Sequence, residues 1–481
     1  MNFADWAGTP GQPGTVVDLR VPRAMTDLVS RYASARPDVL EAALAHVFGI
    51  GAQTVAIEHR YIDLDYRNEH SRFYSGTFRR YPSVTHRLHF FASPLPAKME
   101  DPATPATFPA AEYLGYLVVR PVPGAPVGRT FVRAGANLES HVGCISNDRV
   151  NLYGRDLSVP GAPFMAQDAQ LTVCAHASVW MAAYHHHLRF GSRRPLPGDI
   201  ADAAATALGL GRPVPSGGLN ALQISEAVRV LGLPCVAYNL RRLPKGEDVF
   251  SLICRYLNSS MPVIIGGGGH AFTLIGYQQY VGIDGSKKIR FIRQDDEVGP
   301  YQLIDDPNLD TYSPWDYVIV PLPSKIYVSG ESAELLGRAR LRLTLSALGR
   351  PGDRALLDGF DRRSLRVRTS LIRSNEFKVG LTRRGLDEST SEMYRRIPMP
   401  RWIWVIEATL AAERDRGEQC VVAEAVIDAT DHLRDLRVLA WRVPGRLYRW
   451  LPDEDDYLVY GDLQEDRAMT CVAAVSQKVV S

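Results

Sequence analysis

The sequence predicts an α+β protein in three parts, which cover residues 1–160, 161–325 and 326–481. Its 481 residues exceed what one ordinary hydrophobic core accommodates, so several domains are expected. In the middle part helical patterns come first and short apolar strands follow, as in α+β domains and unlike alternating β-α-β units. The outer parts mix helices and strands in other orders, and both are predicted to be further α+β domains.

The composition is that of a globular protein and argues against several function classes. Hydrophobic residues make up 46% of the chain and charged residues 22%, and the net charge of +2 does not indicate nucleic-acid binding. No apolar stretch is long enough to cross a membrane, and the N-terminus lacks a basic region followed by an apolar run. We therefore expect a soluble, cytoplasmic protein without a membrane partner.

The first part carries a long helical pattern and then strands. Residues 23–49 show helical spacing, whereas residues 55–81, 85–93 and 112–122 are predicted as strands with polar connections. This order predicts an α+β domain.

The middle part opens with a helix predicted from about Cys174 to Arg189, because apolar residues recur there at spacings of three or four. Shorter helices are predicted in residues 199–209 and 248–260 and after Asn220, which is a plausible N-cap. Short apolar strands then follow, bounded by turn residues. They span residues 261–266, 270–280, 288–296 and 315–323.

The last part begins with a basic amphipathic helix in residues 332–350. Strands are predicted after it, in residues 365–375, 401–410, 420–430 and 436–444. We interpret this segment as a third domain.

Cys174 is the candidate nucleophile. The six cysteines of the chain form no CxxC pair, which argues against a disulfide framework and a zinc ribbon. Cys174 stands at the first turn of its predicted helix, where the positive end of the helix dipole and the free amide groups stabilise a thiolate. Polar residues precede it, so the site is expected to be open to solvent.

A candidate base and its orienting carboxylate lie downstream. His270 begins the strand HAFTLIGY directly after four glycines, where a strand fixes the imidazole and the backbone can approach closely. Asp295 stands near the end of a later strand and is the preferred acceptor for the Nδ1 proton of His270. Asp296 is the alternative, and it would point to the opposite face if the strand continued.

An oxyanion hole completes the constellation. Gln167 lies seven residues before Cys174, and Gln170 lies four residues before it. A side-chain amide beside the backbone N–H of Cys174 would supply the second hydrogen-bond donor. We take Gln167 as the candidate and keep Gln170 as the alternative.

The order Gln167, Cys174, His270 and Asp295, with the motif HAFTLIGY, resembles papain-like cysteine peptidases. The resemblance is closest to the bacterial branch that includes the double-glycine leader, or bacteriocin-processing, peptidases, and it covers about 160 of the 481 residues. It implies that the middle part is a papain-like domain with a helical half and an antiparallel-sheet half. The sequence departs from the family at Ala175, where the family has glycine, and in the glutamine spacing, which is usually six. The flanking parts resemble no family.

Two further clusters do not indicate a metal site. Consecutive helical residues are about 100° apart, so His185–His187 do not converge on one ion, and we interpret them as a partly exposed helix end. Asp63, Asp65, Glu69 and His70 are interpreted as salt-bridged strand and turn residues. Neither a metal nor an organic cofactor is expected.

These residues together predict a cysteine peptidase that hydrolyses a peptide or isopeptide bond. His270 deprotonates Cys174, the thiolate attacks the carbonyl carbon, and water clears the thioester. The alternatives are an acyltransferase or deamidase with the same triad, and a catalytically inactive papain-like module that binds partners. The expected partner is a protein or peptide substrate, with a regulatory protein on the flanking domains and no nucleic acid.

Overall fold

A computed structural model of the chain describes residues 14–32, 38–96, 108–168, 173–206, 219–243, 248–282, 285, 287–305, 315–361, 365–410, 421–432, 438–451, 456–461 and 469. Helices combine with antiparallel sheets, so the predicted α+β class is confirmed. The chain forms two compact units, one of Met1–Lys245 with Ser260–Pro323 and one of Gly246–Ser259 with Ser324–Ser481. The finer division at residue 160 stays a prediction. Among the described residues, no helix combines the length and apolarity needed to span a membrane.

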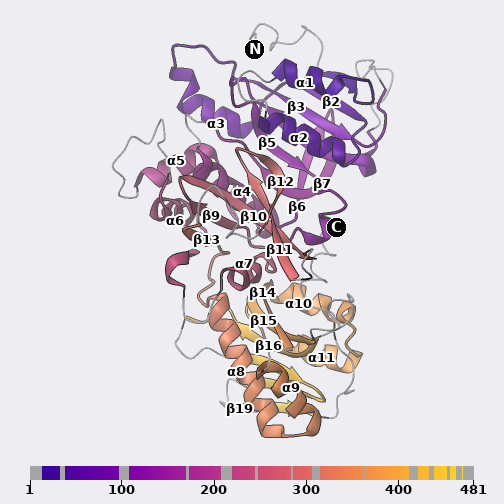
Figure 1. The fold of residues 1–481 in the computed structure, drawn as a ribbon, viewed down its shortest axis with the longest axis vertical. Helices are drawn as coiled ribbons and strands as arrows, with labels where there is room; N and C mark the ends of the chain where they lie inside the picture. The colour runs from indigo at the N-terminus through magenta and orange to yellow at the C-terminus, as the bar shows by residue number, and fades with distance from the viewer. Residues whose placement is uncertain are drawn as a thin grey trace. The chain divides into compact units, whose positions relative to one another are not determined.

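The first unit contains a seven-stranded antiparallel sheet built from N-terminal residues, in the order β1-β2-β3-β4-β5-β7-β6 (Figure 1). Strands β3, β4 and β5 are buried along their whole length, because both faces of this part of the sheet are covered. The elements of this region are β1 (Gly14–Asp18), α1 (Ala24–Tyr32), α2 (Asp38–Gly49), β2 (Thr54–Tyr61), α3 (Leu64–Arg72), η2 (Tyr74–Gly76), β3 (Thr85–Phe91), η3 (Ala110–Glu112), β4 (Tyr113–Val119), β5 (Val127–Val132), η4 (Glu139–His141), β6 (Ser146–Leu152) and β7 (Arg155–Phe164).

Helix α3 corrects the prediction that residues 55–81 form only strands. The carboxylate of Asp63 accepts a hydrogen bond from the backbone N–H of Tyr66 and so caps the helix. The interpretation of the acidic cluster as salt-bridged is right, because Glu69 pairs with Arg120 at 3.1 Å, but its assignment to strand and turn is wrong. The cap, rather than apolar periodicity, decides the local structure here.

The first unit also contains a six-stranded antiparallel sheet, in the order β12-β11-β10-β9-β13-β8, and helix α4 packs against its strand β10. Strands β8 and β12 add to the predicted strands. Helix α6 begins with the predicted N-cap, since the side chain of Asn220 accepts from the backbone of Gln223 and the Gln223 side chain accepts in return. The elements are α4 (Cys174–Phe190), α5 (Pro197–Thr206), α6 (Ala221–Val230), β8 (Cys235–Asn239), η5 (Leu240–Arg242), β9 (Val263–Gly267), β10 (His270–Val281), β11 (Lys287–Asp295), β12 (Gly299–Ile304) and β13 (Tyr317–Pro321).

Helix α4 differs from the prediction in its surroundings. It was expected to be apolar along one face, but every residue from Ala175 to His186 is buried. The helix therefore lies inside the unit, where a helix with no polar face is stable.

Buried hydrogen bonds join the two sheets of the first unit close to the end of β11. The Tyr301 hydroxyl donates to the carbonyl of Val132 and accepts from the backbone N–H of Ala162, each at 2.8 Å. The Gln294 amide donates to the carbonyl of Ala162 at 3.1 Å. Because Gln294 directly precedes Asp295, these contacts fix the chain where the candidate carboxylate lies.

The second unit is a six-stranded antiparallel meander, β14 to β19, with α8 lying along one face of the sheet (Figure 1). A buried ion cluster stabilises it, in which Arg384 donates to Glu407 at 2.8 Å and to Glu424 at 2.7 Å. Helices α9, α10 and α11 were not predicted. The elements are α7 (Val249–Leu257), α8 (Gly330–Leu348), α9 (Pro351–Asp361), β14 (Leu365–Arg373), α10 (Ser374–Gly380), η7 (Leu381–Arg384), α11 (Glu388–Arg396), β15 (Trp402–Leu410), β16 (Val421–Asp428), β17 (Val438–Val443), β18 (Arg446–Leu451) and β19 (Asp456–Tyr460).

Candidate active site

Cys174 is the first residue of α4, at the position the sequence indicated. The N-cap residue, Val173, is extended and its side chain makes no capping hydrogen bond. The first amide groups of a helix have no partner within the helix, and they favour an anion. Cys174 is half-buried, whereas Cys144 in the same unit is fully buried. A thiol at this end of a helix is placed for nucleophilic chemistry.

His270 is held at the start of β10 by a tight hairpin and by a contact to α4. Its strand pairs with β9 through Gly267, and the turn uses Gly268 and Gly269 at positive φ, 58° and 88°. The Thr273 hydroxyl donates to the carbonyl of Ser178 at 3.1 Å. That bond fixes the strand against the helix about one turn after Cys174.

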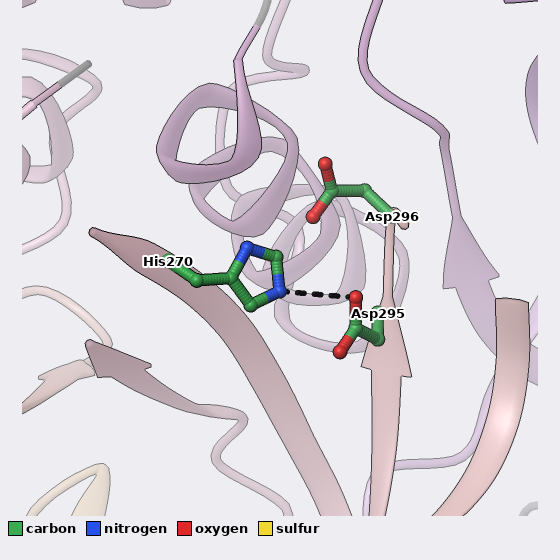
Figure 2. Close-up of side chains that lie close together, drawn as sticks. All are labelled: His270, Asp295 and Asp296. Carbon is green, nitrogen blue, oxygen red and sulfur yellow. Dashed lines mark hydrogen bonds and ion pairs between the residues drawn. The ribbon is translucent and has the colours of Figure 1, made fainter. Parts of the chain in front are cut away.

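The imidazole of His270 bonds to both other members of the predicted triad. Its Nε2–H donates to Oδ1 of Asp295 at 3.1 Å, as Figure 2 shows. The ring also shares a hydrogen bond with the thiol of Cys174. The expected nitrogen was wrong: Asp295 accepts from Nε2 and not from Nδ1.

The environment favours a charged imidazole. Burial opposes the imidazolium, but the hydrogen bonds with Asp295 and Cys174 and the charges of Asp295 and Asp296 outweigh it and raise the pKa of His270 to about 11. Burial also works against the Asp295 carboxylate, yet the hydrogen bond and charge of His270 and the charge of Arg293 keep its pKa below the ordinary value. The pair is therefore an imidazolium bound to a carboxylate.

Asp296 lies beside the same ring. Strand β11 ends at Asp295, so Asp296 does not follow the strand alternation to the far face. Polar atoms of His270, Asp295 and Asp296 lie within 4.8 Å of one another (Figure 2). Burial, and next the charge of Asp295, raise the pKa of Asp296 well above its usual range. Asp295 carries the hydrogen bond to the imidazole, and Asp296 lies next to it without one.

These three side chains have the spacing of metal ligands, but their other contacts do not suit an ion. Nη1 of Arg293 lies 3.0 Å from Oδ2 of Asp295, and the other oxygen of Asp295 already accepts from His270. A guanidinium in contact with a ligand oxygen repels a metal ion electrostatically. The donor set fits the ion pair better than a metal.

Gln167 lies next to this cluster and contacts a residue that the sequence analysis did not single out. Its side-chain amide donates to Oε1 of Glu297 at 2.8 Å, and Oε2 of Glu297 lies 4.0 Å from Nδ1 of His270. Gln170, the alternative oxyanion residue, lies outside the described residues. The oxyanion role of Gln167 stays a prediction, because its amide is engaged by Glu297 here.

A buried ion-pair network holds the segment that carries Gln167. Arg120 pairs with Glu69 and donates to the carbonyl of Ala166 at 3.0 Å. The Tyr74 hydroxyl donates to Asp168 at 2.5 Å. Gln167 therefore sits between two anchored neighbours, which limits where its side chain reaches.

The histidine run on α4 is buried, contrary to the expected exposed helix end. His185 and His186 are fully buried. Burial lowers the pKa of both imidazoles, that of His186 to about 3, so both are neutral at ordinary pH. The prediction of favourable cations at this helix end is wrong for these two residues.

Comparisons with known proteins do not identify a family for this chain. No family model matches the sequence. No curated protein matches it. Among solved structures, UfSP from C. elegans is similar over 34% of this chain, with 18% sequence identity and a TM-score of 0.23. The match spans about one third (33%) of the length of the UfSP chain. A likeness this partial does not define a family, and the function therefore follows from the residues of this chain.

Proposed function

We propose that this chain is a cysteine peptidase of papain-like arrangement, in which Cys174, His270 and Asp295 hydrolyse a peptide or isopeptide bond through a thioester. One observation supports this best: an imidazole bonds both a thiol at a helix N-terminus and a buried carboxylate. A structural cysteine needs neither partner. The combination is the one that thiol nucleophiles use.

The proposed reaction runs in two steps. The Cys174 thiolate attacks the carbonyl carbon, and the His270 imidazolium gives a proton to the leaving amine. Neutral His270 then takes a proton from water, whose oxygen attacks the thioester and releases the acid and the Cys174 thiolate. Asp295 holds the ring in one orientation and stabilises its charged form.

The N-terminus of α4 supplies one hydrogen-bond donor to the proposed oxyanion hole. The backbone N–H of Cys174 is one donor, since it belongs to the unpaired first turn. Gln167 supplies the second donor once its amide leaves Glu297. The arrangement supports an oxyanion hole that substrate binding completes.

The proposal is tested by the reactivity of the thiol. The full-length protein is treated with iodoacetamide at about pH 6, and the labelled cysteines are identified by mass spectrometry. Cys174 is expected to react roughly tenfold faster than an ordinary thiol, because it lies at a helix N-terminus and is bonded to the imidazole of His270. His270→Ala should remove this advantage, while the buried Cys144 stays slow in both proteins.

Equal, slow labelling of all six cysteines would contradict the proposal and favour an inactive interaction module. An acyltransferase or deamidase uses the same reactive thiol. Product masses separate these reactions, because hydrolysis of a peptide adds water and gives two fragments, acyl transfer adds the acceptor amine, and deamidation releases ammonia.

A further inference from the structure

A cavity of about 220 Å³ adjoins the candidate active site. Its walls are mostly small and apolar: Val39 of α2, the segment from Gly124 to Val127, and Ala166. Gln167, Asp296 and Glu297 supply its polar surface. The space suits one side chain of a substrate rather than a large ligand.

Asp296 is the unexplained group in this cavity. Asp296 is 1% exposed, and neither of its carboxyl oxygens has a hydrogen-bond partner within the described part of the chain. A buried polar group without a partner is destabilising, and native proteins retain one where a ligand satisfies it. None of the residues that line the cavity is cationic, so its polar end carries only carboxyl groups and an amide.

Glu297 connects the cavity to the imidazole of His270, which in the proposed reaction protonates the leaving amine. Glu297 lines the cavity and approaches Nδ1 of His270 to 4.0 Å. Nδ1 is the nitrogen left for proton transfer, because Nε2 is held by Asp295. The leaving amine takes its proton from Nδ1. The substrate residue that carries this amine is therefore the one nearest to the cavity.

We propose that this cavity is the subsite for the residue on the amine side of the scissile bond, and that Asp296 and Glu297 select a lysine or arginine side chain there. The assignment to that residue rests on the proposed function. The cationic preference rests on the cavity alone, because it follows from an unpartnered buried carboxyl group facing a space lined by no cation.

The electrostatics support this occupant. Burial and the charge of Asp295 raise the pKa of Asp296, and an incoming ammonium or guanidinium would lower it by favouring the charged carboxylate. The same cation competes with Gln167 for Glu297, which frees the Gln167 amide for the oxyanion. Arg293 beside Asp295 disfavours a metal ion as the occupant.

A binding experiment tests the preference without relying on turnover. Lysinamide and norleucinamide, which differ by the side-chain ammonium, are titrated into the full-length protein by calorimetry at neutral pH. Lysinamide should bind at least about tenfold more tightly. Asp296→Asn should remove that difference, and Glu139→Gln, which changes an exposed carboxylate away from the cavity, should preserve it.

The ratio of the lysinamide and norleucinamide affinities of the wild-type protein tests the cationic preference even if Asp296→Asn fails to fold. Equal binding of the two amides would overturn the proposal, as would heat from Ca²⁺ with none from lysinamide, which would indicate a metal ion. Digestion of a mixed peptide library then tests the placement. Cleavage before lysine or arginine supports it, and cleavage with no basic preference overturns it. An inert Cys174 together with a strong preference for lysinamide would overturn the proposed peptidase and the placement, and would still support a cation site.

Discussion

Replacing Asp295 by asparagine separates the charge of the predicted triad from its geometry. Asparagine keeps an oxygen that accepts from Nε2 of His270, so the ring is expected to stay in place. The variant loses only the negative charge, which lies 3.1 Å from the imidazole. Any change in the protonation of His270 then reports that charge.

The size of the effect follows from the charges around the ring. An opposite charge this close shifts a pKa by about 1–3 units, so the pKa of His270 should fall from about 11 to about 8–10. The shift should lie nearer one unit, because Asp295 also raises the pKa of Asp296. Without Asp295, Asp296 ionises more readily and replaces part of the lost charge.

The assay is the NMR titration of histidine Cε1 signals in the full-length protein. The chain has 12 histidines, and His270→Ala identifies the signal of interest. In the wild type this signal should not titrate below about pH 9, whereas in Asp295→Asn it should titrate one or more units earlier. Glu139→Gln serves as the control for a carboxylate lost elsewhere. A wild-type His270 that titrates near 6.5, or an Asn variant that behaves as the wild type does, would refute the reasoning.

The same shift sets a pH dependence of stability. The pKa of His270 is higher in the folded state than its ordinary value of 6.5, so folding binds the proton more tightly. This contribution to the free energy of unfolding is complete below about pH 6.5 and is lost as the pH rises toward about 11. In Asp295→Asn the loss should end at a lower pH, which urea unfolding at several pH values measures.

Two further substitutions test how the site is held. Arg120→Met leaves Glu69 buried without its partner and should lower the free energy of unfolding by roughly 3 kcal/mol in urea titrations, whereas Arg20→Met, at an exposed ion pair, should leave it essentially unchanged. Thr273→Val removes the hydrogen bond to the carbonyl of Ser178 and should cost about 1 kcal/mol and slow alkylation of the Cys174 thiol, while Thr273→Ser, which keeps the hydroxyl, should not.

The pairing of His270 with Asp295 could be predicted because local rules govern it. Apolar runs and glycines mark both strands, and antiparallel neighbours bring the start of one next to the end of the other. The register confirms this, since Thr273 of β10 lies opposite Gln294 of β11. The ring nitrogen that faces the carboxylate could not be predicted, because it depends on the rotamer of His270 within the packed site.

Other features depend on contacts between distant segments. The position of Glu297 beside Gln167 joins residues 130 apart in the chain, and no local pattern encodes it. The burial of His185 and His186 likewise depends on what packs around α4. Helix α3 is different: Asp63 is a recognisable N-cap, and the apparent strand pattern concealed that local signal.

Three consecutive carboxyl groups at the end of β11 have different contacts because their surroundings differ. Asp295 is buried but bonded to His270, and it stays ionised because the imidazolium and Arg293 compensate it. Asp296 is equally buried without such a bond, and its pKa is raised well above the ordinary value. Glu297 has half of its side chain exposed and binds the amide of Gln167. The surroundings at the end of β11, rather than the residue types, therefore determine which carboxyl group bonds the imidazole and which one lines the cavity without a hydrogen-bond partner.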